Sequence, residues 1–215
     1  MILRNFFITA FIIIFTVSCG QPDQEWNSYG LDLSNQRFSR ITQINKTNVE
    51  TLEMAWQVQT GVPATFQSTP IVHEGVMFVS LPFNNVLALD AKTGNEIWRY
   101  EHDLNPNWKL CCGPSNRGVA LQGKQLFFGT VDARLISLNI KTGEKIWDIN
   151  VVKNNVETES ISDLDESDTN SDKQISGGTG VGISMAPVVY NGKVIIGITG
   201  VGYGLHIEEE GPNTP

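Results

Sequence analysis

Cysteine is scarce in this sequence, and so is clustered positive charge. The 215 residues include three cysteines, and 15 lysines and arginines against 23 aspartates and glutamates. Three cysteines cannot form a four-cysteine metal site. The formal net charge of −8 is not offset by any basic cluster and repels phosphate backbones, so nucleic acid is not an expected partner.

Histidine is scarce as well, with His73, His102 and His206 scattered along the chain. No Ser-His-Asp or metal-ligand spacing joins them, so we expect them in turns or at the surface. Gly-x-Gly pieces occur at 177–182 and 197–204, but neither opens a helix after a strand of a βαβ unit. A dinucleotide site is therefore not expected.

Beyond residue 17 the sequence has no long apolar run. Arg4 precedes a mostly apolar stretch at 6–17, which is too short to span a bilayer comfortably. It predicts a signal peptide over residues 1–19. Ser18-Cys19-Gly20 matches a lipoprotein cleavage site, although an ordinary signal peptide with Cys19 incidental is the alternative. We expect a periplasmic protein held at the outer membrane only through a lipid anchor, where disulfides persist.

The chain contains an internal repeat. Val86–Trp98 and Leu135–Trp147 share a Lys-Thr-Gly turn, and their glycines, Gly94 and Gly143, are 49 residues apart. An apolar strand pair with a turn glycine precedes each copy, and a third such pair follows at 186–199. A period of this length, with short strands and a recurrent tryptophan, is typical of β-propeller blades. A generic β-sandwich, the alternative, lacks a fixed repeat.

We therefore predict an all-β, β-propeller fold over 20–215. Trp98 and Trp147 are expected to wedge between neighbouring blades. The chain holds about two complete units, the start of a third and a leading segment with Trp56. A propeller needs at least about four blades to close its ring. We therefore expect a truncated chain that contains only the first blades.

Residues 154–173 form an acidic insertion between the second and third units. A calcium loop is one interpretation, because Asp163, Asp165 and Ser167 alternate. Asp168 and Gln174 stand where such a loop needs Gly and Glu, so a solvated surface loop is the expectation.

Cys111 and Cys112 are adjacent and can close only a small ring across one peptide bond. Such a ring contributes little loop entropy to stability. A functional role for the pair is therefore the better interpretation.

Several segments together resemble the quinoprotein alcohol dehydrogenases, which use pyrroloquinoline quinone (PQQ). The most specific is Cys111-Cys112-Gly-Pro-Ser-Asn-Arg117-Gly118, and the others are 26–30, 35–39, 42–45, 52–61, 68–70 and the repeats. The resemblance covers nearly all of 26–204. It implies an eight-bladed propeller, of which this chain is the N-terminal part.

The resemblance also implies one wall of a cofactor pocket. A disulfide between Cys111 and Cys112 would stack on the flat quinone, and Arg117 would reach its anionic rim. Ser184 stands where the family usually has a threonine contacting a cofactor carboxylate, and Thr199-Gly200-Val201 matches the next contact segment. For Ser184 and Thr199, ordinary turn or strand polarity is the alternative.

Two positions depart from the family pattern. Gln67 stands where the family often has a glutamate near the cofactor, and is a candidate contact without the charge. Gly202 stands where the alcohol dehydrogenases usually carry the glutamate that binds calcium. Glu208–Glu210 could substitute, but a solvated acidic run is the better interpretation. The catalytic aspartate and the other metal ligand lie beyond residue 215 in the family.

The implied function is periplasmic oxidation of a small alcohol by bound PQQ, assisted by calcium or another metal ion. Electrons would pass to a periplasmic cytochrome or another acceptor. This chain alone is expected to be inactive, with no catalytic or metal residue of its own. The alternatives are a PQQ-dependent sugar dehydrogenase, and a non-catalytic, lipid-anchored propeller scaffold of the outer-membrane assembly type, which Gly202 favours and the cysteine pair opposes.

Overall fold

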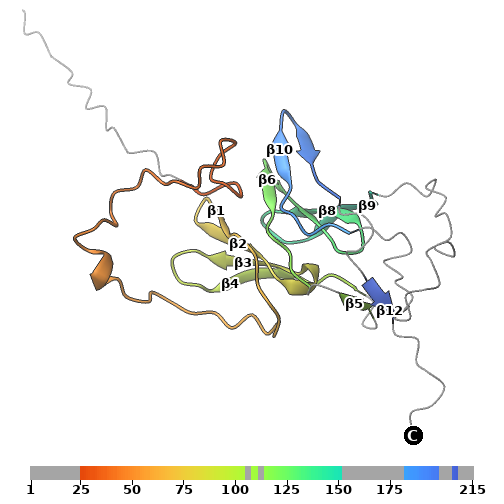
Figure 1. Ribbon diagram of the computed structural model, residues 1–215, viewed down its shortest axis with the longest axis horizontal. Coiled ribbons are helices and arrows are strands. Elements are labelled where there is room, and N and C mark those ends of the chain that lie inside the picture. Colours follow the sequence, from red (N-terminus) through yellow and green to blue (C-terminus); the bar gives the residue numbers. More distant parts are fainter. Residues whose placement is uncertain (1–24, 105–107, 111–113, 152–181, 199–204, 208–215) are drawn as a thin grey trace, which may run out of the picture.

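The computed structural model describes residues 25–104, 108–110, 114–151, 182–198 and 205–207. Over these ranges the protein is built from strands, with two short 3-10 turns, η1 (Val49–Thr51) and η2 (Pro82–Asn84) (Figure 1). No helix in the described ranges is long and apolar enough to cross a membrane. The prediction of an all-β chain is confirmed.

Two four-stranded antiparallel sheets form the body of the protein. The first sheet contains β1 (Ile71–His73), β2 (Val76–Ser80), β3 (Val86–Asp90) and β4 (Glu96–Tyr100) in that order. The second contains β6 (Ala120–Gln122), β7 (Gln125–Gly129), β8 (Arg134–Asn139) and β9 (Lys145–Asn150), also in order. Each sheet is therefore one meander, as propeller blades are.

The 49-residue repeat is reproduced in the register of the sheets. Phe78, Ala88 and Trp98 are paired across the first sheet, and Phe127, Ser137 and Trp147 across the second. A register shift follows Ala88 in one sheet and Ser137 in the other. The repeated sequence thus folds into the same unit twice.

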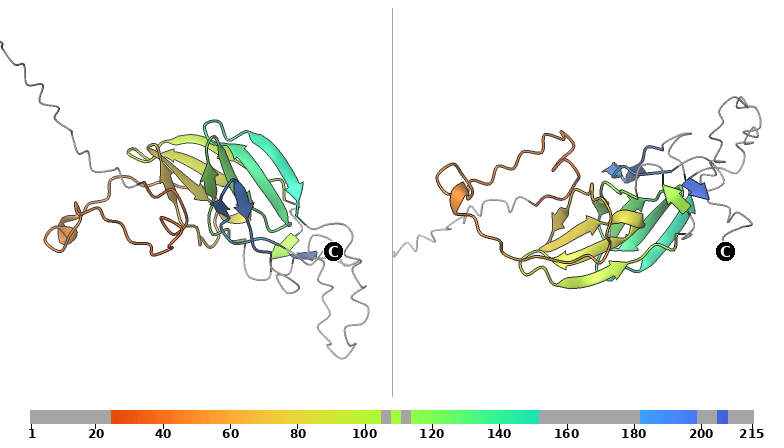
Figure 2. Two further views of the ribbon diagram at one scale, coloured as in Figure 1. Left: turned by 90° about the horizontal axis from the view of Figure 1, so that it is seen from above. Right: turned by 60° about the horizontal axis from the view of Figure 1, so that its bottom comes forward.

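A third sheet begins with the hairpin β10 (Val188–Tyr190) and β11 (Lys193–Ile195). Its turn, at Asn191 and Gly192, has positive φ at both residues, which Asn and Gly adopt most readily. β10 lies beside β6 in all three views (Figures 1 and 2). This hairpin confirms the third strand pair that the sequence predicts.

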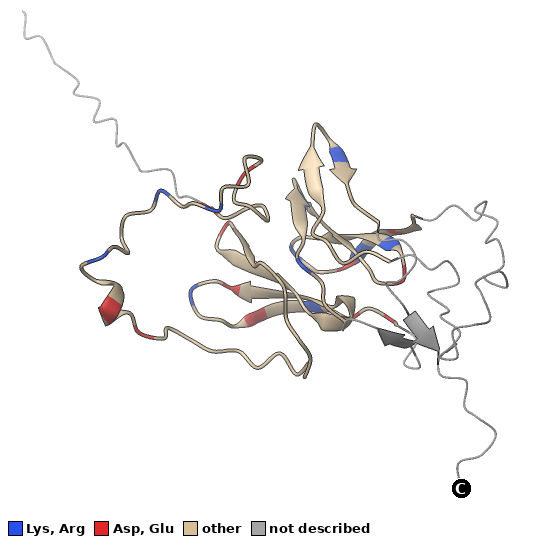
Figure 3. Cartoon of the chain, viewed as in Figure 1, with Lys and Arg blue, Asp and Glu red and all other residues tan. Residues whose placement is uncertain are grey.

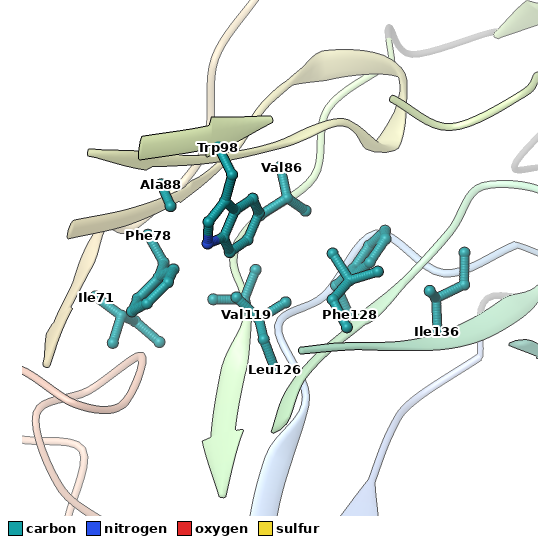
Figure 4. Close-up of a cluster of buried hydrophobic side chains, with 10 residues drawn as sticks. Ile71, Phe78, Val86, Ala88, Trp98, Val119, Leu126, Phe128 and Ile136 are labelled. Atoms are coloured by element: carbon teal, nitrogen blue, oxygen red, sulfur yellow. The ribbon is translucent and has the colours of Figure 1, made fainter. Parts of the chain in front are cut away.

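The largest cluster of buried side chains lies between the two complete sheets. Phe78, Val86 and Trp98 of the first sheet face Phe128 of the second sheet and Val119, which directly precedes β6 (Figure 4). The opposite face of the first sheet is covered by the segment that contains Trp56, Val58 and Val62. Each face of the first sheet is therefore buried against a different neighbour.

Trp98 lies between the blades, as predicted. Its Nε1 donates to the Ile140 carbonyl at 3.0 Å, and a Cβ built on Gly143 would stand 2.6 Å from its ring. Trp56 makes the same two contacts one blade earlier, with the Ala91 carbonyl and Gly94. The Lys-Thr-Gly glycine therefore leaves room for the tryptophan of the preceding unit. Trp147 packs on Phe127 of its own sheet.

Candidate functional site

Because the strands alternate in direction, every second connection lies at the same end of the sheets. The segment before β1, the β2–β3 connection, the β4–β6 connection, the β7–β8 turn and the segment before β10 all lie at one end, called here the Arg117 end. Hydrogen bonds between blades at this end confirm the alignment, for example from the Phe83 N–H to the Pro114 carbonyl at 2.9 Å. The tight turns at Gly75, Gly94, Gly123 and Gly143 lie at the opposite end.

At the Arg117 end, three segments from three blades lie side by side. The Thr69 N–H donates to the Arg117 carbonyl at 3.1 Å, and the Arg117 N–H donates to the Ser184 carbonyl at 3.0 Å. The Arg117 side chain continues the link, because its Nη1 donates to the Ser184 Oγ at 2.6 Å. Two of the predicted site residues, 67 positions apart in the chain, are thus in direct contact.

The residues next to Arg117 explain how it is held. Asn116 is buried, and its Nδ2 donates to the Gly129 carbonyl at 2.7 Å while its Oδ1 accepts the Gly118 N–H. Gly118 has φ of 149°, and a Cβ there would stand 3.3 Å from the Ala186 Cβ. Glycine is favoured here because the backbone conformation and the close approach of the third blade both disfavour a side chain. Asn116 and Gly118 therefore hold the backbone on both sides of Arg117.

Arg117 is a partly buried cation, and no described carboxylate forms an ion pair with it. It stands at one end of a cavity of about 760 Å³ between the segment 27–35 and the inner strands β6 and β10. Elsewhere in the described chain, basic and acidic side chains are dispersed over the elements (Figure 3). A guanidinium that bonds a neutral hydroxyl retains charge and donors for an anionic ligand, which fits the rim of an anionic quinone.

The other predicted site residues are either exposed or outside the described residues. Gln67 is exposed and lies at the Arg117 end, two residues before Thr69, whose N–H binds the Arg117 carbonyl. Cys111, Cys112 and Thr199–Val201 lie outside the described residues. Their assignment stays a prediction.

A strand pair that the sequence does not predict adjoins both of these segments. β5 (Trp108–Leu110) pairs with β12 (Leu205–Ile207), with Leu110 opposite Leu205. Cys111 directly follows the first strand, and the glycine-rich segment 200–204 directly precedes the second. The pairing therefore links the two parts of the chain from which the predicted contacts come.

A His–Asp pair at the Arg117 end was also missed. His102 Nε2 lies 3.0 and 3.1 Å from the two Asp132 oxygens, and these side chains are only 6% and 13% exposed. His102 lies in a connection between strands, but its side chain is buried, so the expectation of a surface position is wrong. No sequence signal joins the two residues, because they lie 30 positions apart on connections of different blades.

The pair has a clear electrostatic consequence for Asp132. Burial pushes the pKa of its carboxyl upward, but hydrogen bonds from His102 and Thr130 and the His102 charge outweigh burial and lower the pKa. The carboxylate is therefore stabilised in its charged form. A second His–carboxylate pair, His73 with Glu25 at 2.7 Å, lies at the opposite end and is more exposed.

Among the described residues, no three His, Cys, Asp or Glu side chains are grouped to hold a metal ion. Gly202, which stands where the family usually has a metal-binding glutamate, and Glu208–Glu210, which could substitute for it, lie outside those residues.

Comparison with known proteins agrees with this architecture. Residues 26–211 match the family model described as "PQQ: Glucose/ethanol/alcohol dehydrogenase, beta-propeller domain". Quinohemoprotein alcohol dehydrogenase ADH IIB of Pseudomonas putida is 36% identical over 86% of this chain and 24% of its own length. The 1-butanol dehydrogenase (cytochrome c) of Thauera butanivorans is 32% identical over 84% of this chain and 23% of its own length.

Solved structures give the same result. Quinohemoprotein alcohol dehydrogenase from Comamonas testosteroni matches with a TM-score of 0.68 and 34% identity, over 82% of this chain and 23% of that one. A europium-containing methanol dehydrogenase matches with a TM-score of 0.65 and 26% identity, over 82% of this chain and 28% of that one. The chain spans about a quarter of the length of the curated relatives that it matches. On these grounds the chain belongs to the PQQ family of glucose/ethanol/alcohol dehydrogenase β-propeller domains.

Proposed function

We propose that this chain forms one wall of the PQQ pocket of an alcohol dehydrogenase. The observation that carries the proposal is the direct contact of Arg117 with Ser184 at the Arg117 end of the sheets. Family membership supports PQQ as the cofactor, and relatives named as alcohol dehydrogenases support an alcohol as the substrate.

In this proposal Arg117 binds an oxygen at the rim of the quinone. Its Nη1 is engaged by Ser184, which orients the guanidinium and leaves its other N–H groups to face the ligand. The Ser184 hydroxyl can itself donate to a cofactor carboxylate while it accepts from Arg117. Gln67 and Thr199–Val201 are proposed as further polar contacts, because they belong to the same end or to the matching family segment.

Cys111 and Cys112 are proposed to form a disulfide ring that covers one face of the quinone. A rigid, apolar cap suits a flat tricyclic ligand, because it buries the ring face without ordering a flexible side chain. The cofactor, when bound, supplies the two-electron acceptor for hydride removal from the alcohol. Calcium or another metal ion is proposed as the partner of the quinone, with ligands beyond the described residues.

The cofactor role of Arg117 is tested by titrating the full-length protein with PQQ. We expect Arg117→Lys to weaken PQQ binding about tenfold, equivalent to about 1.4 kcal/mol, because an ammonium cannot form the paired hydrogen bonds of a guanidinium. Arg117→Ala should weaken it further. Binding is followed by quenching of tryptophan fluorescence.

Arg99→Lys is the matched control. Arg99 is also a partly buried arginine, but it binds the Thr60 carbonyl and Glu96 on the outer strand of the first sheet. This change should leave PQQ affinity unaltered. Wild-type affinity in Arg117→Ala would refute the assignment.

Substrate and acceptor are tested on the same protein after PQQ and calcium are added. The proposal expects oxidation of short primary alcohols with a soluble dye or cytochrome c as acceptor, in line with the relative named as a cytochrome c enzyme. Oxidation of glucose with no oxidation of alcohols would move the assignment to a sugar dehydrogenase.

We also propose that the protein is exported and lipidated at Cys19, which lies outside the described residues. Support comes from the apolar stretch at 6–17 and from Ser18-Cys19-Gly20. Labelled palmitate should enter the wild-type protein and Cys111→Ser but not Cys19→Ser. Absence of label from the wild-type protein would leave only an ordinary signal peptide, and equal labelling of Cys19→Ser would exclude Cys19 as the lipidated residue.

A further inference from the structure

The β4–β6 connection, residues 101–119, carries Cys111 and Cys112 and is held on both sides of that pair. On the side nearer β4, the His102 N–H donates to the Asn85 Oδ1 at 2.9 Å. The imidazole of the same residue reaches Asp132 of the second blade at 3.0 Å. His102 therefore ties the connection to the loops of two different blades, one through its main chain and one through its side chain.

On the side nearer β6, three contacts add to those of Arg117 described above. The Pro114 carbonyl accepts the Phe83 N–H at 2.9 Å, the Asn116 carbonyl accepts the Ser80 hydroxyl at 3.3 Å, and the Asn116 Nδ2 donates to Gly129. The β2–β3 loop, which contains Phe83 and Asn85, thus contacts the connection on both sides of the cysteine pair.

The loops that hold the connection have strained backbones. Phe83, Asn84 and Ala133 have φ of 62°, 63° and 60°, in the left-handed region that non-glycine residues rarely adopt. At the opposite end the equivalent turns rely mainly on glycine. Backbone strain persists only where surrounding contacts determine it, and it is concentrated at sites with a function. Buried Asn84 supplies one such contact, because its Oδ1 accepts the Val131 N–H at 3.2 Å.

The His102–Asp132 pair is more deeply buried than the other His–carboxylate pair. The side chains of His102 and Asp132 are 6% and 13% exposed, whereas those of His73 and Glu25 are 30% and 31% exposed. A buried His–carboxylate pair is weak evidence for net stability, because desolvation opposes the attraction. This pair does join the connection to the β7–β8 turn of the second blade through side chains that are largely shielded from water.

We propose that His102, Asp132 and Asn85 form a clamp that orients the connection carrying Cys111 and Cys112. This inference rests on the proposed function, because it makes the three residues positioning residues for the cysteine wall of the quinone pocket. They act through the connection and do not themselves touch the quinone.

The test uses four variants of the full-length protein. Asp132→Ala and His102→Ala break the pair, and Asp132→Asn is the conservative variant that keeps an acceptor for the imidazole. Glu25→Ala breaks the pair of the same chemistry at the opposite end. Circular dichroism at a temperature well below each melting point establishes that every variant is folded.

The first readout is PQQ affinity and the absorption spectrum of the bound quinone. We expect Asp132→Ala and His102→Ala to weaken PQQ binding about tenfold and to shift the spectrum, as loss of an outer contact that orients a binding group does. Asp132→Asn should recover most of the affinity, and Glu25→Ala should match the wild type. Wild-type affinity and spectrum in folded Asp132→Ala and His102→Ala would overturn the clamp.

The second readout needs no quinone and separates the two proposals. After reduction, Cys111 and Cys112 are alkylated with iodoacetamide, and the rates are followed by mass spectrometry. The clamp predicts a severalfold change of rate in Asp132→Ala and none in Glu25→Ala. If the wild type fails to bind PQQ but this difference is seen, the proposed function fails and the clamp stands. Equal rates in all variants would remove the clamp, whatever PQQ does.

Discussion

The first and second sheets share one sequence pattern, yet their tryptophans have different environments. Both sheets have the same strand order, the same register and the same shift after the central residue of the third strand. Trp98 is 8% exposed, because it is covered by the Gly143 turn of the second sheet. Trp147 has no such turn against it in the described chain and contacts Phe127. Both tryptophans contact a phenylalanine of their own sheet, and the turn of the next blade supplies the additional burial of Trp98.

The largest expected effect tests this dependence directly. Trp98→Ala should lower the free energy of unfolding by about 3–5 kcal/mol, because it opens a cavity between two sheets and removes the hydrogen bond to Ile140. Trp147→Ala should cost less if its burial depends only on the described residues. Urea unfolding of both variants measures the difference. Equal losses would show that Trp147 is covered to the same extent by chain outside the described residues.

The next effect concerns the turn that receives the tryptophan. Gly143→Ala should cost about 3 kcal/mol, because φ of 72° strains an alanine and its Cβ would stand 2.6 Å from the Trp98 ring. Gly123→Ala is the control, with φ of 57° and no atom within 4 Å of the added Cβ, and should cost about 1 kcal/mol. In the first sheet, Gly94 and Gly75 offer the same contrast. Thermal unfolding of the four alanine variants measures these losses of stability. Equal losses in all four would contradict the role of Gly94 and Gly143 in leaving room for a tryptophan ring.

A smaller effect concerns the buried carboxylate of Asp132 at the Arg117 end and depends on pH. The folded-state pKa of Asp132 is lowered, so its charge contributes stability above the unfolded pKa of about 3.9, and this contribution is lost as pH falls through the folded value. At pH 7 Asp132→Asn should cost about 1 kcal/mol, because a hydrogen bond to a charged group is replaced by one to a neutral amide oxygen. The gap between variant and wild type should close below about pH 4. Urea midpoints from pH 7 to pH 3 measure it, and a gap that does not change with pH would show that the Asp132 charge is not the cause.

The smallest effect uses the central residue of each third strand. Ser137 occupies the position of Ala88, and its Oγ is buried without a hydrogen-bond partner among the described residues. Ser137→Ala should therefore raise stability by about 1 kcal/mol by removing a buried unsatisfied hydroxyl. Ala88→Ser, the reciprocal change, should lower it. A loss of stability in Ser137→Ala would reveal a partner for this hydroxyl in the rest of the chain.

Features with a local cause were predictable from the sequence. The 49-residue period, the alternation of apolar residues and the turn glycines predicted β1–β4, β6–β9 and the β10–β11 hairpin. Each of these depends on residues close together in the chain, where side-chain periodicity and backbone preference act directly. The wedge position of Trp98 could be predicted for the same reason, since a large apolar ring recurs at one point of each unit.

The candidate site was predictable only in part. Arg117 and Ser184 were both identified through the family resemblance, yet nothing in the sequence predicts their 2.6 Å contact. The pairing of β5 with β12 and the His102–Asp132 pair were not predicted either. These contacts join positions 30 to about 100 residues apart, with no periodic pattern between them.

The sequence by itself therefore determined which units form, where their turns lie and which residue types stand at the Arg117 end. Local hydrophobic periodicity and the steric freedom of glycine are sufficient for that. Only the tertiary structure decided which of those residues meet, because the meeting depends on how successive sheets stack around the tryptophans. That stacking brings Thr69, Arg117 and Ser184 from three blades into one row of hydrogen bonds.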